Sequence, residues 1–282
     1  MNYFIPLLIA LVIGSTKEIF KKKILINIAP IKFIIIFYSI MFIFAQLTIY
    51  KISIPNLHGW ILIFISSIFY LLSNLIGLRM LKELKISIIK PIEGLDSIFV
   101  LFMSFFILKE VLKLTQFIGI AIIITPLLYM FYKQYKKHAI KKNQIFLIFI
   151  GIFFASSTTI IDKLALKIID PISYFYFLKL VLIVMFILVL FIFYKQRINF
   201  KIVKKSLLPI SILAFFTMIG SYAYFFALND PFANTGVTKT ILSTSIIFST
   251  FIGGKYFREN NLKEQVIISL FVILGINILV FF

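Results

Sequence analysis

The chain has 282 residues, of which 62% are hydrophobic, and a mean hydropathy of +1.10. A soluble domain is typically about 45–50% apolar, so this composition excludes a soluble globular protein and indicates one that lies in a lipid bilayer. The net charge is +19. Because the basic residues sit in short segments between apolar stretches, this charge indicates orientation in a membrane and not binding of nucleic acid.

Apolar stretches follow one another along the whole chain, each close to the length of about 20 residues at which a helix crosses the hydrocarbon core. They predict an all-α integral membrane protein with ten transmembrane helices. The expected helices cover residues 3–20, 31–49, 58–78, 87–108, 115–132, 144–162, 172–194, 206–228, 235–254 and 264–282. Four prolines are expected at helix entrances, where a missing N–H costs least, namely Pro30, Pro55, Pro171 and Pro209. Pro91 falls inside the fourth span and is expected to kink it.

The stretch from Ile88 to Tyr129 has a second copy that begins at Val237. At a constant spacing of 149 residues, Lys90 aligns with Lys239, Glu110 with Glu259, and Gln116 with Gln265. The basic segment 133–142 separates five spans from five, so residues 1–143 and 144–282 are expected to form two five-helix repeats. An odd number of spans in each repeat makes the two repeats inverted, an arrangement found in many secondary transporters.

Lys and Arg are unevenly distributed between odd-numbered and even-numbered loops. The loops after odd-numbered spans, counted with the flanking span ends, hold 22 Lys and Arg, and the loops after even-numbered spans hold five. The positive-inside rule therefore predicts that the odd loops are cytoplasmic and that both termini lie outside. The chain has no Cys and only two His, both in expected loops, and it carries no motif for nucleotide binding or hydrolysis. No enzyme activity, metal or cofactor is expected.

Together, these features resemble the drug/metabolite transporter superfamily, and most closely its EamA-type members. The residues that carry the resemblance are Gly14, Ser15, Pro30, Pro91, Leu108–Glu110, Gln116 and Gly119 in the first half, and Pro171, Glu259, Gln265 and Gly275 in the second. The resemblance implies a transporter with a central cavity lined by the first four helices of each half. It also implies that the fifth and tenth helices pack at the periphery, in some members at a dimer contact.

The chain departs from the family pattern in two ways. Thr240 stands in the second half where Pro91 stands in the first, so one of the two kinks is expected to be missing. Members of the family usually keep both termini in the cytoplasm, whereas the charge count places both termini outside.

Charged side chains within the spans identify a candidate site, because an ionisable group at mid-membrane costs about 2.5–3.5 kcal/mol unless it has a partner, water or a function. Lys90, Glu93 and Asp96 occupy about a third of the circumference of the fourth span. Asp96 lies deepest, and with Glu93 it is the candidate coupling group that carries a proton or binds a cation. The alternative is a structural ion pair between Asp96 and Lys239.

Polar residues on other spans complete the candidate site. The substrate-binding candidates are Lys90, Glu93, Asp96, Lys239, Ser243, Asn74, Tyr222 and Ser157. Each has a plainer alternative, because a Lys near a helix start can reach the membrane interface, and small hydroxyl or aromatic residues often serve helix packing.

Buried lysines together with buried carboxylates suit a small zwitterion such as an amino acid. The expected function is secondary active transport of such a polar metabolite across the cytoplasmic membrane by alternating access, with proton coupling. One alternative is a transporter of organic cations or quaternary amines, or a drug efflux protein. A second is a non-transporting accessory protein for a lipid-linked intermediate. The expected partners are a small-molecule substrate, membrane lipid and a second copy of the chain, docked through the fifth and tenth helices, with no nucleic acid.

Overall fold

The structure is a computed structural model that describes residues 3–111, 113–136, 141–193 and 200–256, together with residues 271, 274, 275 and 278. Within these residues every regular element is a helix. The elements are α1 (Phe4–Leu25), α2 (Pro30–Ala45), the 3-10 helix η1 (Gln46–Lys51), α3 (Leu57–Glu83), α4 (Ile86–Glu93), α5 (Asp96–Met103), the π-helical turn η2 (Ser104–Leu108), α6 (Leu114–Lys136), α7 (Lys142–Leu166), α8 (Pro171–Phe193), α9 (Phe200–Asn229), α10 (Thr235–Ser243) and α11 (Ser245–Tyr256).

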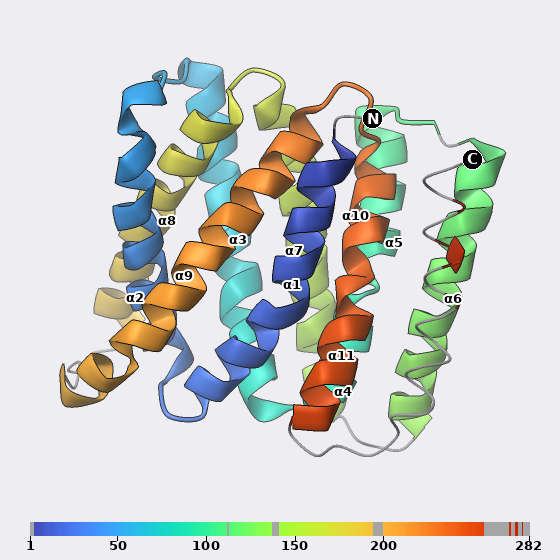
Figure 1. Cartoon of the computed structure of the whole chain (residues 1–282), viewed down its shortest axis with the longest axis horizontal. Helices are drawn as coiled ribbons and strands as arrows, with labels where there is room; N and C mark the ends of the chain where they lie inside the picture. Colours follow the sequence, from blue (N-terminus) through green and yellow to red (C-terminus); the bar gives the residue numbers. More distant parts are fainter. Residues whose placement is uncertain are drawn as a thin grey trace.

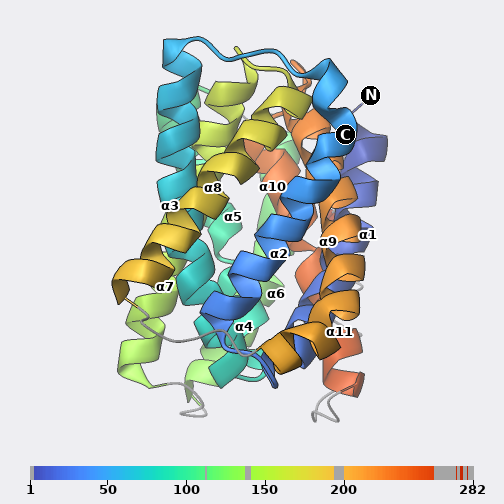
Figure 2. The ribbon, with the colours of Figure 1, turned by 90° about the vertical axis from the view of Figure 1, so that its left-hand side faces the viewer.

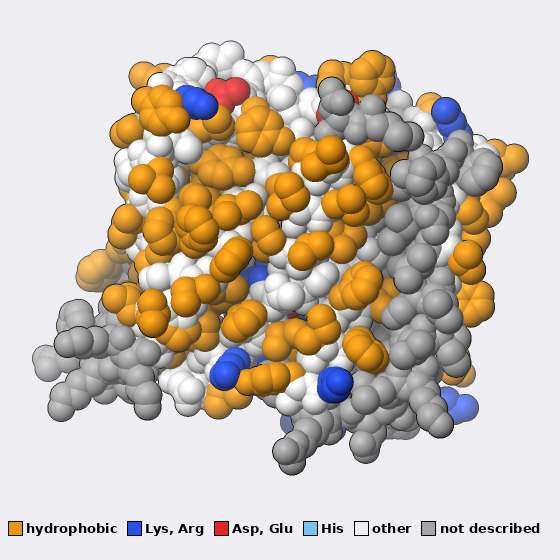
Figure 3. Space-filling view, in the orientation of Figure 1, with side chains coloured by type: hydrophobic (Ala, Val, Ile, Leu, Met, Phe, Trp, Pro, Cys, Tyr) orange, Lys and Arg blue, Asp and Glu red, His pale blue; other side chains and the backbone are white. Residues whose placement is uncertain are grey.

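Six helical segments in the described part of the chain are long and apolar enough to cross a membrane. They are Pro30–Lys51, Leu57–Glu83, Lys142–Leu166, Pro171–Ile192, Ser206–Asn229 and Thr235–Gly253. Two shorter apolar helices cover Asp96–Leu108 and Leu114–Pro126. Large apolar side chains such as Phe191 and Leu208 remain more than 70% exposed, and hydrophobic side chains are spread over the described part of the face in Figure 3. A bilayer is the solvent that suits such a surface.

The helices run lengthwise between two ends of the molecule (Figures 1 and 2). The connections 26–29 and 84–85 lie at one end, together with the last turn of α6 and the first turn of α7. We call this the basic end, because the Lys-rich loops of the sequence flank it. The connections after η1, η2, α7 and α9 lie at the other end, which we call the opposite end.

The fourth and ninth expected spans are each broken into two helices. α4 gives way to α5 at Gly94 and Leu95, three residues after Pro91, and α10 gives way to α11 at Thr244. Leu95 and Thr244 are 149 residues apart, so the two breaks stand at equivalent positions of the sequence repeat. The expectation of a missing kink in the second half is therefore wrong. The Ser243 and Thr244 hydroxyls bond to the carbonyl oxygens of Lys239 and Ile241, and such bonds within a helix bend it without a proline.

Helix starts follow the local sequence in most places. Pro30 and Pro171 are the first residues of α2 and α8, as predicted. Asn56 and Asn234 cap α3 and α10 by accepting hydrogen bonds from Gly59 N and Val237 N. Pro209 differs from the prediction, since it lies inside α9. The apolar part of α9 begins at Ser206, and the helix extends upstream of it through a charged segment that reads as a loop in the sequence.

The largest buried cluster lies between α1, α2, α3, α7, α8 and α9, and it includes Tyr174, Phe33 and Phe186, each at most 1% exposed. The tenth expected span falls largely outside the described residues. Its residue Gly275 packs against α6, because a Cβ there would come within 2.6 Å of Ile123 Cγ1 and 2.9 Å of the Gly119 carbonyl oxygen. α6 itself lies at the edge of the bundle (Figure 1).

Candidate functional site

A cavity of about 420 Å³ lies among the helices. Side chains from α1, α2, α3, α4, α7, α8, α9, α10 and α11 line it, together with Asp96 at the first turn of α5. The lining extends to Leu81 and Ile89, each within one helical turn of the connection 84–85. The cavity therefore reaches the basic end of the molecule, and its volume is in the range of small-molecule sites.

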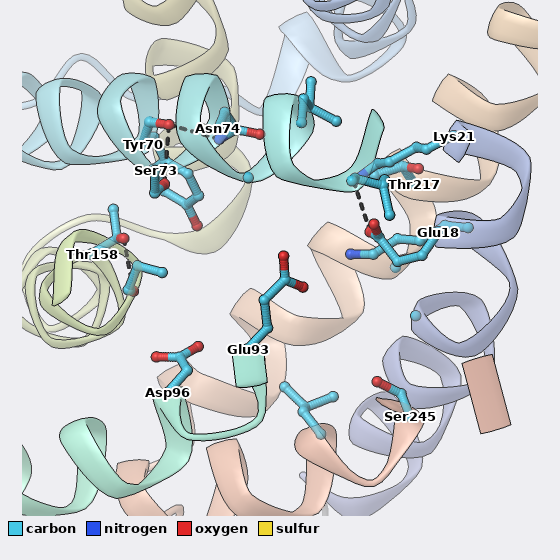
Figure 4. Close-up of a pocket in the computed structure, with 18 of the residues that line it drawn as sticks. Glu18, Lys21, Tyr70, Ser73, Asn74, Glu93, Asp96, Thr158, Thr217 and Ser245 are labelled. Atoms are coloured by element: carbon cyan, nitrogen blue, oxygen red, sulfur yellow. Dashed lines mark hydrogen bonds and ion pairs between the residues drawn. The ribbon is translucent and has the colours of Figure 1, made fainter. Parts of the chain in front are cut away.

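Carboxylates and ammonium groups alternate along the α1–α4 side of the cavity. Lys90 Nζ lies 3.1 Å from a Glu18 oxygen and also pairs with Glu93, three residues further along the chain. Lys21 pairs with the other Glu18 oxygen at 2.8 Å. The Glu93 side chain keeps 29% exposure and projects into the cavity opposite Ser73 and Asn74 of α3 (Figure 4). The pairing of Lys90 with Glu93 agrees with their spacing on one helix face.

Asp96 stands where the two broken helices cross. Its carboxylate lies 2.6 Å from Lys239 Nζ of α10 and also accepts a hydrogen bond from the Ser156 hydroxyl of α7. Lys239 is 3.5 Å from the Thr159 hydroxyl. The ion pair joins the first half of the chain to the second. It is compatible both with a structural role and with a site whose pair opens when substrate or a proton arrives.

A further cation, Lys179 of α8, borders the cavity among aromatic rings. Its Nζ lies 5.2 Å from the ring centre of Tyr38, 5.4 Å from that of Tyr70 and 5.1 Å from that of Phe175. The side chain is only 4% exposed. Three faces of rings at these distances favour the charged ammonium through cation–π attraction.

Behind Tyr70 lies a buried carboxylate, Asp162 of α7, with no exposed surface. It accepts hydrogen bonds from the hydroxyls of Tyr70 at 2.8 Å and Ser66 at 2.7 Å, and also from Tyr174. Tyr70 lines the cavity and Asp162 does not. The tyrosine ring therefore separates the cavity and the ammonium of Lys179 from this negative charge.

The opposite end is held together by hydrogen bonds between loops and helices. Lys163 Nζ donates to the carbonyl oxygens of Leu228 at 2.6 Å and Ala233 at 3.1 Å. The Glu110 carboxylate accepts from both the backbone N–H and the hydroxyl of Thr235, at 2.8 and 2.7 Å, and so caps the start of α10. None of these residues lines the cavity, so the lining ends short of these contacts on the opposite side.

Six of the eight residues expected at the site line this cavity: Lys90, Glu93, Asp96, Lys239, Ser243 and Asn74. The other two lie outside the lining. Tyr222 hydrogen-bonds to Thr48 at 3.0 Å and stacks on Phe175 with ring centres 4.3 Å apart. Ser157 donates to the Phe153 carbonyl oxygen at 2.8 Å and contacts the Met103 sulfur.

Four charged residues of the lining were not among the expected site residues, namely Lys17, Glu18, Lys21 and Lys179. The sequence suggested that the first span ends near residue 20, which places Lys17 and Glu18 at the membrane surface. α1 continues to Leu25, so both lie well inside the helix. For Lys179 the sequence does carry a signal. It lies in the middle of an apolar span, where an isolated ionisable residue indicates a functional site.

Comparisons with known proteins agree with this architecture. The family model of the EamA-like transporter family matches residues 3–132 and 142–281. A solved structure entitled "Crystal structure of protein" is similar in fold, with a TM-score of 0.77, 10% sequence identity, and coverage of 99% of this chain and 96% of that chain. No curated protein matches the sequence.

Proposed function

Because the chain belongs to the EamA-like transporter family, we propose that it is a secondary active transporter of a small zwitterion, such as an amino acid or a related polar metabolite. The family consists of membrane transporters of the drug/metabolite transporter superfamily. The observation that carries the proposal is the cavity itself. It holds ammonium groups and carboxylates, extends to one end of the molecule, and ends short of the contacts that Lys163 makes at the other.

The proposed architecture is ten transmembrane helices in two inverted repeats, residues 1–143 and 144–282. The helix breaks at the equivalent residues Leu95 and Thr244 support it. So does a second pair of contacts, because Lys22 donates to the Leu84 carbonyl oxygen at 2.6 Å and Lys163 donates to that of Leu228 at the same distance. Each lysine thus joins the first helix of its repeat to the end of the third. The two stretches matched by the family model divide the chain at nearly the same place.

In the proposed mechanism the substrate exchanges partners with the charges of the cavity. The substrate's amine binds near Glu93 and Asp96, and its carboxylate approaches the lysines Lys90 and Lys239. Because Lys239 is engaged by Asp96, protonation of Asp96 would release the ammonium for the substrate and couple binding to a proton. Ser243 and Asn74 border the same space and supply neutral polar contacts.

Alternating access requires the contacts at the opposite end to open while those at the basic end close. We place the basic end in the cytoplasm, from the distribution of Lys and Arg, in the cytoplasmic membrane with both termini outside. A homodimer through the fifth and tenth helices is compatible with the position of α6 at the edge of the bundle. Comparison of the purified protein's mass in detergent with the 32.7 kDa chain tests the dimer, and a monomer at all concentrations would refute it.

Uptake into proteoliposomes with an imposed pH gradient tests the function. Wild type is expected to accumulate an amino acid when the gradient is applied. Asp96→Asn has no titratable group at this position. The variant is therefore expected to be produced and folded but to lose the response of uptake to pH. Unchanged pH-driven uptake by this variant would remove Asp96 from the mechanism.

Competition distinguishes the alternatives. Inhibition by quaternary amines, but not by amino acids, would favour an organic-cation transporter or a drug efflux protein. Glu93 gives that alternative its one specific support, since its carboxylate is the most exposed of the acidic groups in the ion pairs of the cavity. Absence of uptake for every compound would favour an accessory protein for a lipid-linked intermediate.

A further inference from the structure

Lys179 differs from three of the lysines that border the cavity. Lys21, Lys90 and Lys239 each lie within 3.1 Å of a carboxylate oxygen. Among the residues that the structure describes, the Lys179 ammonium contacts three aromatic rings and has no hydrogen-bond acceptor or ion-pair partner. An ammonium has three N–H donors, and rings alone leave all three without an acceptor.

A buried cation in this state calls for an explanation, because desolvation is costly when the donors stay unmatched. The ring faces and the charge of Asp162, beyond Tyr70, favour the ammonium electrostatically but do not accept its hydrogen bonds. Lys179 nevertheless borders the cavity, so a molecule inside the cavity can reach it. Its Nζ is not among the fully buried polar atoms of the described residues that lack a partner, so either water or a ligand in the cavity can supply the acceptor.

A second cation faces the same space. Lys17 of α1 lines the cavity and, within the described part of the chain, makes no hydrogen bond or ion pair. The acidic groups of the lining, Glu18, Glu93 and Asp96, are already paired with the other three lysines. The uncompensated positive charge of the cavity therefore resides on Lys17 and Lys179.

We propose that Lys179, in its cage formed by Tyr38, Tyr70 and Phe175, binds the anionic group of the transported molecule, with Lys17 as the second cation of this subsite. The inference rests on the proposed function and specifies which residues bind the carboxylate of the substrate. It moves the carboxylate from Lys90 and Lys239, which have internal partners, to the α8 side of the cavity. The amine of the substrate then points toward the acidic groups on α1, α4 and α5.

The test measures ligand binding to purified protein by thermal stabilisation, apart from transport. The probes are the twenty L-amino acids, with the carboxamide and the decarboxylated amine of each. At least one amino acid is expected to stabilise wild type, and its carboxamide and amine are expected to bind at least 10-fold more weakly. Lys179→Gln is expected to lower the affinity for that amino acid by about 10- to 100-fold, the effect of losing a charged hydrogen-bond donor.

Three further variants make the result specific. Lys179→Arg keeps the charge and is expected to retain much of the affinity, which separates loss of binding from misfolding. Lys17→Gln is expected to weaken binding several-fold. Lys82→Gln changes an exposed lysine outside the cavity lining and is expected to bind as wild type does.

The inference is overturned if the carboxamide binds as well as the acid, if Lys179→Gln keeps wild-type affinity in a folded protein, or if none of the carboxylate-bearing probes stabilises wild type. Binding that depends on Lys179, without any accumulation of the same compound in proteoliposomes, contradicts the proposed transport function and leaves the anion subsite in place. The two failures are therefore distinguishable.

Discussion

The acidic residues that line the cavity are all matched by cations, and this matching explains how an apolar bundle tolerates them. Glu18 has two lysines, Glu93 has Lys90, and Asp96 has Lys239 together with the Ser156 hydroxyl. Removal of one partner from such a buried pair leaves an uncompensated charge, which is far more costly than the net gain of the pair. Substrate can therefore replace an internal partner only by supplying a charge of the same sign at the same place.

Asp170 illustrates a different use of a carboxylate, outside the membrane-spanning helices. It precedes α8 and accepts hydrogen bonds from the backbone N–H groups of Ile172 and Ser173 at 3.0 Å, and from the Ser53 hydroxyl at 2.9 Å. Burial alone would raise the pKa of this carboxyl. The hydrogen bonds from Ser173, Ser53 and Ile172 outweigh burial and hold the pKa of Asp170 below its ordinary value.

Asp170→Ala is expected to lower the free energy of unfolding by about 1 kcal/mol at neutral pH, which corresponds to a fall in Tm of about 2–4 °C. Because the pKa is lower in the folded state, the ionised carboxyl stabilises the protein above the unfolded pKa of about 3.9, and this contribution is lost as the pH falls through the folded pKa. The Tm gap between wild type and variant, measured in detergent, is therefore expected to narrow on acidification. A gap that stays constant down to about pH 3 would contradict the assignment.

At the scale of elements, the two broken helices are the parts that build the site. α5 packs against α10, and α4 packs against α11, so the breaks bring Asp96 and Lys239 together from opposite halves of the chain. Gly236 makes the α5–α10 approach possible, because a Cβ there would lie 2.5 Å from Leu101 Cδ2 and 3.2 Å from Ser104 Oγ.

Gly236→Val is expected to destabilise the protein by about 1–3 kcal/mol, the usual cost of overpacking, and to weaken ligand binding because it separates α10 from α5. Gly77→Ala is the matched control, since the added Cβ would meet only Glu93 Oε1, at 4.0 Å. That control is expected to be neutral or to stabilise by about 0.4–1 kcal/mol. Thermal unfolding in detergent compares the two, and equal stability of both variants would refute the close approach.

Hydropathy alone predicts where most of the helices lie, but it does not predict their ends or their breaks. Each of the first nine expected spans coincides with a described helix or a broken pair, because long apolar runs have few other stable forms in a bilayer. The sequence predicts the end of the first span near residue 20, whereas α1 continues to Leu25. Its charged residue Glu18 is paired with Lys90 of another helix, and no local sequence pattern predicts this pairing. The break at Thr244 depends on hydroxyl bonds within the helix, and Thr and Ser also occur in straight helices.

The candidate site could be predicted in part for the same reason. Lys90, Glu93, Asp96 and Lys239 stand out because charges in apolar spans are rare, and all four line the cavity. The ion pair between Asp96 and Lys239 depends on how α5 and α10 cross. The spacing of residues within one helix does not predict that crossing. Tyr70 and Tyr38 could not be distinguished from the other aromatics, since 17% of the chain is aromatic and their role comes only from the position of Lys179.

At the scale of the whole molecule, the two ends differ in how close the cavity lining comes to them. The cavity reaches the basic end, whereas Lys163 and Glu110 hold α9 and α10 at the opposite end. In the proposed orientation, with the basic end in the cytoplasm, the cavity extends toward the cytoplasmic side. The proposed transport function requires that this one cavity opens in turn to the two sides of the membrane.

Labelling of single introduced cysteines tests this alternating access directly. Because the chain has no Cys of its own, each introduced thiol is the only one that can react. The variant Ser73→Cys places a thiol in the cavity, and Lys85→Cys and Lys167→Cys mark the basic and the opposite end. A membrane-impermeant thiol reagent is applied from each side, with and without an amino acid that stabilises the protein.

With the proposed orientation, we expect Lys85→Cys to react only from the cytoplasm and Lys167→Cys only from outside. We expect Ser73→Cys to react rapidly from the cytoplasm and more slowly from outside, and bound ligand to slow both reactions. Reaction of Ser73→Cys from one side alone, unaffected by any ligand, would contradict alternating access through this cavity. Reaction of Lys85→Cys only from outside, and of Lys167→Cys only from the cytoplasm, would show that the orientation is the reverse of the one proposed.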